Sequence, residues 1–518
     1  MKYVIGADIG TTNLKAGLYD TSGQCLSSAA RRYETNVEKS RAEQNPEDWW
    51  RAFVEVLGDI AEECGAERMK DVCAVCISSQ TPTLLPLDSY GNPLRNAIIW
   101  MDRRADNELS WILSKLGEER YVQITGAKPD VSFLPAKLLW YRQNEPELFE
   151  KTRCFLQVSS FIVYRLTGKF SMDIDQAALT QCIDIKTGTW SDEIGSTIGV
   201  EFEQYFPNPV PAETPVGSIK EDVAALLGLS CDTLVLAGTS DAIAAMNASG
   251  LVRLGEATEV AGTSSLVFAG TETPPDYHTV GAQKSTMPGV PYIFNSPISS
   301  TGASFKWYFD TIGCDIERLA DEEGIDLHEL MGRWASRSPA GSGGVIYFPY
   351  LMGERAPLWN SHAKGMFIGL SASTTRYDIA RAIFEGTAFA LRDVISEFER
   401  NGTKTDSLRV VGGGARNDLW LKIKASVLGV PVLVVDKKSG DVPFGDALIA
   451  WRSCGVYDAG DNSMIEIERV IDPDPSWVEI YNAIFPYYKE FYWSLDEGLK
   501  SYEQTLKNLE GQNQAPKV

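Results

Sequence analysis

The first residues of the chain alternate between apolar runs and short polar turns, as paired strands do. Residues 4–9 form a nearly continuous apolar run, a Gly-Thr-Thr turn covers 10–12, and a second run covers 13–19. Apolar runs of this length, bounded by turn residues, favour strands over helices. A third run, Cys25–Arg31, is predicted to extend the same sheet.

Longer stretches with apolar residues three or four positions apart predict helices between the strands. Asn45–Cys64 has this spacing, with Pro46 near its start, and the strand-like run Val72–Ser78 follows it. The order strand, strand, strand, helix, strand predicts a mixed sheet with helices on its faces. The other predicted helices are Leu134–Asn144, Phe149–Thr152, Ser160–Thr167, Ala242–Ser249, Gly302–Ile312, Thr375–Phe398, Asn417–Leu428, Phe444–Cys454 and Trp477–Leu509.

Further strand-like runs complete the predicted pattern. Two hairpins are expected, one from Leu84–Leu87 and Ala97–Trp100 and one within Ile183–Trp190. The tail Gly511–Val518 is polar and is expected to be disordered. Single strands are predicted at Leu234–Ala237, Gly343–Pro349, Leu408–Val411 and Val432–Val435.

The opening pattern returns in the middle of the chain. Residues 257–269 again read as strand, Gly-Thr-Ser turn and strand, so that Gly262-Thr263-Ser264 aligns with Gly10-Thr11-Thr12. This alignment places Val260 where Asp8 stands in the first copy. Internal similarity of this kind predicts two related halves, of which only the first carries the carboxylate.

Length and charge narrow the function classes. The chain has 518 residues, enough for two to four domains, and a formal net charge of −22 with a pI near 4.7. This acidity argues against wide surfaces for nucleic acid or anionic membranes. We find no signal sequence and no run of the roughly 18 apolar residues that a membrane span needs. A cytoplasmic protein is expected.

Cysteine and histidine usage excludes several kinds of site. Nine scattered Cys form no disulfide framework, and only three His are present, which disfavours a His-based metal site or a Ser-His-Asp hydrolase. Cys73 and Cys76 have C-x-x-C spacing but lie in a predicted buried strand. Packing in the core is the interpretation we favour for this pair, and a redox or metal role is the alternative.

The first turn has the chemistry of a phosphate site. The backbone amides of Gly10, Thr11 and Thr12 could converge into an anion-binding nest, with Gly10 supplying a positive φ or a close approach to a ligand. Asp8 beside this nest could hold Mg²⁺ directly or through water. The alternative is an ordinary hairpin with a polar turn. The chain contains neither the P-loop nor the Rossmann glycine pattern.

Asp241 stands at a predicted junction between strand and helix, after Gly238-Thr239-Ser240. A carboxylate there could accept the proton of a substrate hydroxyl that attacks a γ-phosphoryl group. The structural alternative is a helix N-cap, supplied by Ser240 or Asp241. The two roles are compatible, because an N-cap position leaves a side chain at a cleft edge.

Two further stretches could bind the parts of a sugar and a nucleotide. Gln80, Thr81 and the run Trp100–Arg104 offer the donors and acceptors that a polyol needs, although Asp102–Arg104 could simply be a solvated helix start. Gly412–Gly414 could pass close to an adenine or ribose, with Asn417 offering its amide. The alternative there is a tight turn between strand and helix.

These motifs, taken in order, resemble the FGGY family of carbohydrate kinases, which phosphorylate polyols and ketoses with MgATP. Residues 8–12 and 261–264 resemble the two phosphate motifs of that family, 100–104 its substrate loop, and 412–415 its adenosine motif. The blocks 353–357, 365–370 and 385–389 also match, so the resemblance covers about residues 3–460. The most similar branch is that of the xylulose kinases.

The resemblance implies an actin-like, ribonuclease H-like fold: two duplicated α/β domains with mixed sheets flanked by helices, and ATP and sugar meeting in a cleft. The expected domains are 1–248, 249–475 and a helical extension with tail, 476–518. Asp241 would be the catalytic base, Asp8 and Asp241 would hold Mg²⁺, and Gln80, Thr81, Trp100, Asp102, Arg103 and Asp241 would bind the sugar. The expected ATP-binding residues are Gly10, Thr11, Thr12, Asn13, Lys15, Gly262, Thr263, Ser264, Gly302, Lys306, Gly413, Gly414, Ala415 and Asn417.

Departures from the family pattern concern the substrate. Thr81-Pro82 stands where xylulose kinases usually carry Met-His, Ala242 replaces an Asn or Gln after the catalytic Asp, and 444–447 departs from the usual small-residue pattern. D-xylulose, phosphorylated at a terminal hydroxyl, is the expected substrate; gluconate, ribulose, erythritol and glycerol are alternatives. A non-kinase actin-like ATPase is the alternative from another class. The expected partner is a small sugar or polyol, without nucleic acid or membrane, and homodimer formation is left open.

Overall fold

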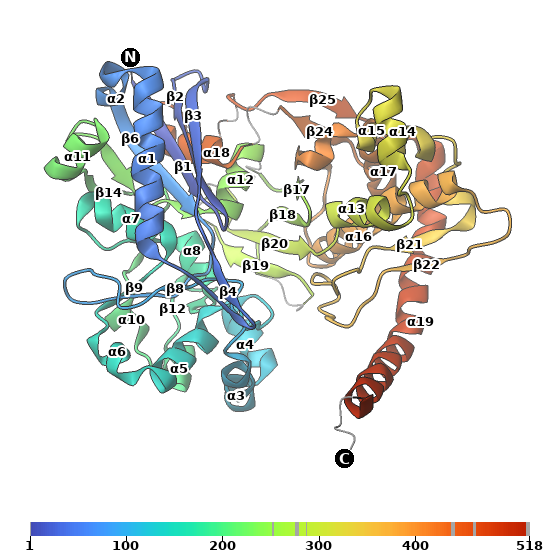
Figure 1. Cartoon of the computed structure of the whole chain (residues 1–518), viewed down its shortest axis with the longest axis horizontal. Helices are drawn as coiled ribbons and strands as arrows, with labels where there is room; N and C mark the ends of the chain where they lie inside the picture. Colours follow the sequence, from blue (N-terminus) through green and yellow to red (C-terminus); the bar gives the residue numbers. More distant parts are fainter. Residues whose placement is uncertain are drawn as a thin grey trace. The chain divides into compact units, whose positions relative to one another are not determined.

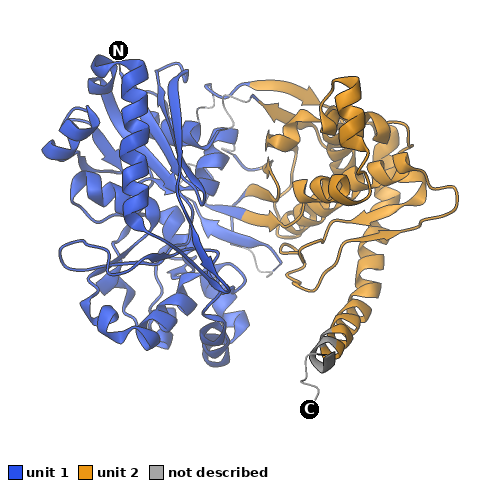
Figure 2. Ribbon diagram, viewed as in Figure 1, with its two compact units in different colours: residues 1–254, 270–294, 436–466 blue, residues 255–269, 295–435, 467–518 orange. Residues whose placement is uncertain are grey.

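The computed structural model of the chain describes residues 2–250, 253–274, 279–285, 287, 289–436, 441–458, 461 and 463–513. They form two compact units, each assembled from separate segments of the chain (Figure 2). Unit 1 contains residues 1–254, 270–294 and 436–466, and unit 2 contains 255–269, 295–435 and 467–518. Of the tail predicted to be disordered, 514–518 lie outside the described residues, whereas 511–513 end the last helix.

The main sheet of unit 1 has the strand order β14-β15-β6-β1-β2-β3, with β16 also pairing with β6. Strands β1 and β2 form the predicted hairpin, and β1 runs parallel to β6. The mixed sheet expected from the sequence is confirmed. The strands are β1 (Tyr3–Ile9), β2 (Asn13–Tyr19), β3 (Cys25–Arg32), β6 (Val72–Ser79), β14 (Pro215–Ser218), β15 (Leu234–Leu236) and β16 (Thr239–Ser240).

The second large sheet has the order β19-β20-β18-β17-β23-β24-β25. Its hairpin β17–β18 is antiparallel, β17 runs parallel to β23, β23 parallel to β24, and β24 antiparallel to β25. The same sequence of pairings links β2, β1, β6, β15 and β14, so the internal repeat read from the sequence is a repeat of topology. The strands are β17 (Glu256–Ala261), β18 (Ser265–Thr271), β19 (Gly281–Lys284), β20 (Tyr292–Ile298), β23 (Ser407–Gly412), β24 (Val432–Val435) and β25 (Ile467–Ile471).

Small sheets support the loops around the main sheet of unit 1. The hairpin expected within Ile183–Trp190 is present. The one expected from Leu84–Leu87 and Ala97–Trp100 is reduced to a single bridge, because β7 pairs with β9, about 70 residues later, and β8 pairs with β5. These strands are β4 (Asn36–Glu38), β5 (Arg41–Gln44), β7 (Leu85–Leu87), β8 (Ala97–Ile98), β9 (Cys154–Leu156), β10 (Met172–Asp173), β11 (Ile183–Asp184), β12 (Thr189–Trp190) and β13 (Pro209–Val210).

Helices of unit 1 cover its sheet, and further helices form an insertion in the chain between β8 and β14 (Figure 1). Helix α1 shows why the sequence folds this way: Asn45 caps it, Pro46 occupies its first turn, and its apolar face from Trp49 to Ile60 is buried against the sheet. These helices are α1 (Pro46–Cys64), α2 (Ala66–Lys70), α3 (Asp106–Leu116), α4 (Glu118–Thr125), α5 (Leu134–Asn144), α6 (Pro146–Lys151), α7 (Val158–Thr167), α8 (Ile174–Leu179), α9 (Asp192–Ile198), α10 (Phe202–Tyr205), α11 (Glu221–Leu227), α12 (Asp241–Ser249) and α18 (Val442–Ser453).

Helix α18 returns to unit 1 after the chain has built most of unit 2. It packs so closely that a Cβ added at Gly6 would lie 1.9 Å from the carbonyl oxygen of Pro443, and one added at Gly445 would lie 1.9 Å from that of Ala244. Glycine at these two positions therefore sets the approach of α18 to β1 and to α12. The division at residues 248 and 475 suggested by the sequence remains a prediction, and α18 lies between those positions.

The core of unit 2 is formed largely by helices and aromatic side chains, with α16 and α19 contributing long apolar faces. Among the described residues, no helix is long and apolar enough to cross a membrane. The elements are α13 (Gly302–Thr311), α14 (Ile316–Glu323), α15 (Leu327–Ala335), η1 (Ser342–Gly344), β21 (Ile346–Phe348), β22 (Met366–Ile368), α16 (Arg376–Arg400), η2 (Gly413–Arg416), α17 (Asp418–Leu428) and α19 (Pro475–Asn513).

Candidate active site

Two predicted carboxylates of unit 1 lie at the same edge of its sheet. In the register of β1 and β6, Asp8 pairs with Ser78, and in that of β6 and β16, Ser78 pairs with Thr239. All three strands are parallel here, so their carboxyl ends coincide at this edge. Asp241 follows β16 directly. Two carboxylates 233 positions apart in sequence thus flank the end of one strand, where ligands of α/β sheets bind.

The N-cap of α12 is Ser240 and not Asp241. The hydroxyl of Ser240 accepts a hydrogen bond from the amide of Ile243 (3.3 Å) and caps α12, so Asp241 is the first residue of the helix. Its Oδ1 accepts from the amide of Ala242 at 2.7 Å. Burial raises the pKa of Asp241 to about 6, which makes its carboxylate a stronger base than an ordinary aspartate.

Asp8 has the properties of a ligand for a hard cation. It is 9% exposed, and its Oδ1 has no hydrogen-bond partner among the described residues. Burial and then the neighbouring charge of Asp241 raise its pKa well above the usual value, while Lys15, paired with it across the hairpin, opposes that shift. A buried, unpartnered carboxylate oxygen fits Mg²⁺, which usually uses one or two protein carboxylates together with waters and phosphates.

The first turn is held from outside by other loops of unit 1. The amide of Gly10 donates to the carbonyl of Asn13 at 3.1 Å, Tyr33 donates its hydroxyl to the carbonyl of Gly10, and Gln44 donates to that of Thr11 at 2.7 Å. Gly10 does not have a positive φ, so of the two roles considered for it only a close approach remains. A Cβ there would make only ordinary contacts, at 3.4 Å from the carbonyl oxygen of Asn13 and 3.7 Å from Oδ2 of Asp8.

The predicted sugar-binding residues meet this turn. The indole of Trp100 donates to the hydroxyl of Thr11 at 3.0 Å. Gln80 is 1% exposed; its amide nitrogen donates to the side chain of Gln44 at 2.7 Å, and its Oε1 has no partner among the described residues. Thr81 donates to the carbonyl of Ser79 at 3.3 Å. Gln80 and Trp100 thus lie beside the first turn, and Oε1 of Gln80 has no hydrogen-bond partner among the described residues.

Asp102 organises the loop rather than facing solvent. Its carboxylate is fully buried and accepts from the amide of Ala42 (2.6 Å) and from the guanidinium of Arg104 (2.7 Å). Arg103 is half exposed and pairs with Asp130 at 2.9 Å. A solvated helix start, the alternative for this stretch, therefore does not describe Asp102. Of these two side chains, that of Arg103 is the more exposed to solvent. Sugar contact by either remains a prediction.

A buried lysine under this loop gives a pH-dependent stability. Nζ of Lys137 donates to the carbonyl of Ile99 at 2.7 Å, and burial lowers its pKa to about 7 although Asp102 and Asp130 oppose the shift. The pKa of an unfolded lysine is about 10.4, so between these two values the unfolded chain binds more protons and the free energy of unfolding rises with pH. Stability present at high pH is lost as pH falls towards 7.

We expect Lys137→Met to remove this dependence. Relative to that variant, the wild type should gain about 2 kcal/mol in free energy of unfolding between roughly pH 7.5 and 9, as measured by urea denaturation. The exposed Lys151, changed to Met as a control, should leave the wild-type pH dependence intact. If the free energy of unfolding changed with pH in the same way for the wild type and Lys137→Met, Lys137 would be charged in the folded state.

Unit 2 builds a comparable turn. The amide of Gly262 donates to the carbonyl of Ser264 at 2.9 Å, and the start of α13 closes on the turn, with the amide of Gly302 donating to the carbonyl of Gly262 at 3.0 Å. Ala261 pairs with Gly412, whose φ of 88° only glycine adopts readily. Gly262, Thr263, Gly302, Gly413 and Gly414 are therefore neighbours.

Other predicted ATP-binding residues of unit 2 differ in their availability. Asn417 caps α17 by accepting from the amide of Trp420 (3.0 Å) and donates to the carbonyl of His328 (2.9 Å), so its amide is occupied. Lys306 is exposed and pairs with Asp310 at 2.8 Å. The carbonyl of Ala415 accepts from Arg469. ATP contact by these three remains a prediction.

Sequence reasoning gave no role to Asp446, which the structure places beside the site. On α18 it is fully buried and accepts a hydrogen bond from the hydroxyl of Ser78 at 2.7 Å. Burial raises its pKa well above the usual value, and the charge of Asp8 adds to this. The signal available in the sequence was its departure from the small residues usual at 444–447.

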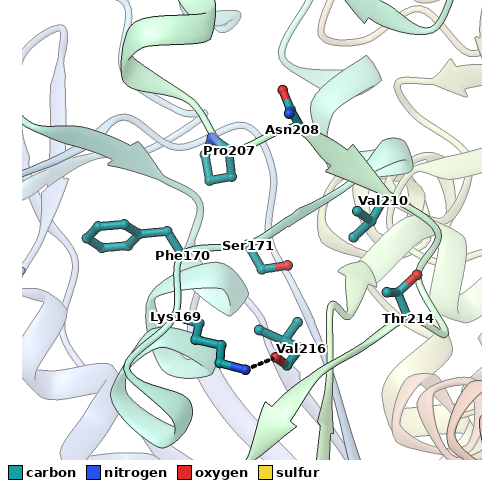
Figure 3. Close-up of a pocket in the computed structure, with 8 residues that line it drawn as sticks. All are labelled: Lys169, Phe170, Ser171, Pro207, Asn208, Val210, Thr214 and Val216. Atoms are coloured by element: carbon teal, nitrogen blue, oxygen red, sulfur yellow. Dashed lines mark hydrogen bonds between the residues drawn. The ribbon is translucent and has the colours of Figure 1, made fainter.

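A separate cavity of about 410 Å³ contains none of the predicted residues (Figure 3). Within it the ammonium of Lys169 donates to the carbonyl of Val216 at 3.1 Å. The cavity is lined by Lys169, Phe170, Ser171, Pro207, Asn208, Val210, Thr214 and Val216.

Among the described residues, no group of three or more His, Cys, Asp or Glu could bind a metal by itself.

Comparison with known proteins covers nearly the whole chain. The family models for the N- and C-terminal domains of FGGY carbohydrate kinases match residues 3–247 and 257–454. A xylulose kinase of Bacillus subtilis is 29% identical over 97% of this chain and 100% of its own length. Two solved structures from Lactobacillus acidophilus each have a TM-score of 0.89 and cover 97% of this chain: a xylulose kinase (26% identical, 100% covered) and a gluconate kinase (25%, 99% covered).

Proposed function

Because the chain belongs to the FGGY family of carbohydrate kinases, with its actin-like fold, and is an ATP-dependent sugar kinase, we propose that its substrate is D-xylulose and its product D-xylulose 5-phosphate. The similarity to xylulose kinases over nearly the full length of both chains is the observation that carries this choice. A cytoplasmic location remains a prediction, and homodimer formation remains open.

In the proposed reaction, Asp241 accepts the proton of the terminal hydroxyl of the sugar. The hydroxyl oxygen then bonds to the γ-phosphorus, and the bond from that phosphorus to the bridging oxygen of ADP breaks. Thr11, Thr12 and the amides of the first turn orient the phosphates, while Gln80 and Trp100 orient the sugar from the side of the same turn.

Magnesium fits the carboxylates of this site. Asp8 would hold it, directly or through water, with Asp241 as the second candidate; when bound, it neutralises charge on the phosphates. Burial raises the pKa of both carboxyl groups, and for Asp8 the neighbouring charge of Asp241 adds to this rise. The chain's own contribution is therefore a pair of carboxylates whose charge needs a cation.

A coupled assay of ADP formation with a panel of sugars tests the substrate. D-Xylulose should give the highest kcat/KM, at least about 10-fold above ribulose, gluconate, erythritol and glycerol, because an unmatched polar group in the pocket costs this much or more. Thermal unfolding with each sugar gives an independent measure, since a ligand that binds the folded state raises the midpoint. A different preferred sugar would overturn the choice of substrate but not the kinase activity.

Gluconate is the second candidate, favoured by one observation. The gluconate kinase structure matches with the same TM-score as the xylulose kinase structure. Gluconate carries a carboxylate, so a gluconate site needs a cation near the sugar. Arg103, half exposed and paired with Asp130, is the more exposed of the two arginines on the predicted loop, since Arg104 is buried. The variant Arg103→Gln should lower kcat/KM for gluconate selectively if gluconate is the substrate.

A further inference from the structure

Two thiols far apart in sequence meet on unit 1. The sulfur atoms of Cys73 and Cys454 lie 3.1 Å apart, although the two residues are 381 positions apart in the sequence. Cys73 is the second residue of β6, and Cys454 caps the end of α18. Among the described residues, no other two thiols are in hydrogen-bond contact, and all nine cysteines are in the free state.

Geometry and exposure favour a bond between these sulfurs. A disulfide bond is about 2.05 Å long, so a relative shift of about 1 Å would join them. Both residues are partly exposed, in contrast to the fully buried Cys76, which completes the C-x-x-C pattern of β6. The partner of Cys73 is therefore not the cysteine that sequence spacing suggested but one supplied by α18.

The environment makes one sulfur the nucleophile. Cys73 donates to the carbonyl of Tyr3 at 3.3 Å, which leaves Cys454 as the donor between the two sulfurs. The hydrogen bond from Cys454, aided by the charge of Lys2 and opposed by burial, lowers the pKa of Cys73 to about 7. A thiolate is the reactive form of cysteine, and attack on peroxide requires it.

We propose that Cys73 and Cys454 form a reversible oxidation site that a hydroperoxide such as hydrogen peroxide converts to a disulfide. The thiolate of Cys73 attacks one oxygen of the peroxide, the O–O bond breaks, and hydroxide leaves, giving a sulfenic acid. The sulfur of Cys454 then attacks that of Cys73 and expels the oxygen as water. Overall two thiols and one hydrogen peroxide give one disulfide and two waters; a dithiol reductant reverses the change.

The bond would tie the returning segment of the chain to unit 1. Residues 436–466 rejoin unit 1 through α18, whose N-terminal half carries Asp446 against Ser78 near the end of β6. A cross-link between Cys454 and Cys73 would attach the C-terminal end of α18 to the start of β6. Because it closes a very long loop, the cross-link should stabilise unit 1 by restricting the unfolded chain.

The test compares the full-length wild type with Cys454→Ser, Cys73→Ser and the control Cys231→Ser, which removes an exposed cysteine elsewhere. Each reduced protein is treated with hydrogen peroxide, its free thiols are alkylated under denaturing conditions, and its peptides are identified by mass spectrometry. The wild type and the control should yield the peptide cross-linked between Cys73 and Cys454, and dithiothreitol should remove it.

Thermal unfolding of the oxidised proteins gives the second measure. Oxidation should raise the unfolding midpoint of the wild type and control by at least about 3 °C, and reduction should reverse the rise. Cys454→Ser should show no rise, and its Cys73 should instead react with dimedone as a sulfenic acid. The proposal fails if the wild type forms no such cross-link, or if Cys454→Ser gains the same stability. Cys454→Ala replaces Cys454→Ser if the serine does not fold.

Discussion

Asp241→Asn is expected to lower kcat by about 10²- to 10⁴-fold, because the amide cannot accept the proton of the sugar hydroxyl. The fold should persist, since Ser240 rather than Asp241 caps α12 and an asparagine oxygen can still accept from the amide of Ala242. Steady-state kinetics with saturating ATP and sugar measures the loss, and calorimetry should find ATP binding retained.

A matched control exists in the same unit. Asp192 is the first residue of α9 and follows the capping Ser191, as Asp241 follows Ser240, but it is exposed and lies outside the site. Asp192→Asn should leave kcat within about twofold of the wild type. If Asp241→Asn kept a kcat close to that of the Asp192 control, Asp241 would not be the base.

Gly445→Ala is expected to lower the free energy of unfolding by roughly 3 kcal/mol, at the upper end of the usual cost of overpacking. The added Cβ would lie 1.9 Å from the carbonyl oxygen of Ala244, a backbone atom of α12 that no side-chain rotation can move. Urea denaturation followed by circular dichroism measures the change. An equal loss is expected for Gly6→Ala, whose Cβ would meet the carbonyl of Pro443.

The control for this pair is Gly58, a glycine inside α1 with no atom within 4 Å of an added Cβ. Gly58→Ala should raise the free energy of unfolding by roughly 0.5–1 kcal/mol, because alanine loses less backbone entropy in a helix. A neutral Gly445→Ala beside a stabilising Gly58→Ala would mean that α18 can move away from α12 at little cost.

Local pattern was sufficient for most of the fold. The bounds predicted for Leu134–Asn144 and Val432–Val435 match the structure, because Pro135 marks the first turn of the helix and the strand is a short, continuous apolar run. The expected hairpin at Leu84–Leu87 was reduced to one bridge, because β7 pairs with a strand about 70 residues later. Pairing over such distances is decided by packing, and no local pattern carries it.

The candidate site shows the same limit. Residue type and position pointed to Asp8 and Asp241, and strand register brings them to one edge of a sheet. What spacing could not reveal is which polar atoms are already occupied: Asp102 is held by Arg104 and Ala42, and Asn417 by its own helix. The contact of Asp446 with Ser78 depends on α18 returning to unit 1, which only the tertiary structure shows.

That return has a consequence for synthesis on the ribosome. The apolar side of the sheet that α18 covers includes Val4, Ala74 and Leu236, and all three leave the ribosome long before the helix does. About 360 residues separate the end of β6 from the start of α18. At a synthesis rate of roughly 5–20 residues per second, this surface therefore stays uncovered for about 20–70 seconds. During that interval the nascent chain offers a chaperone a binding surface that the finished protein no longer has.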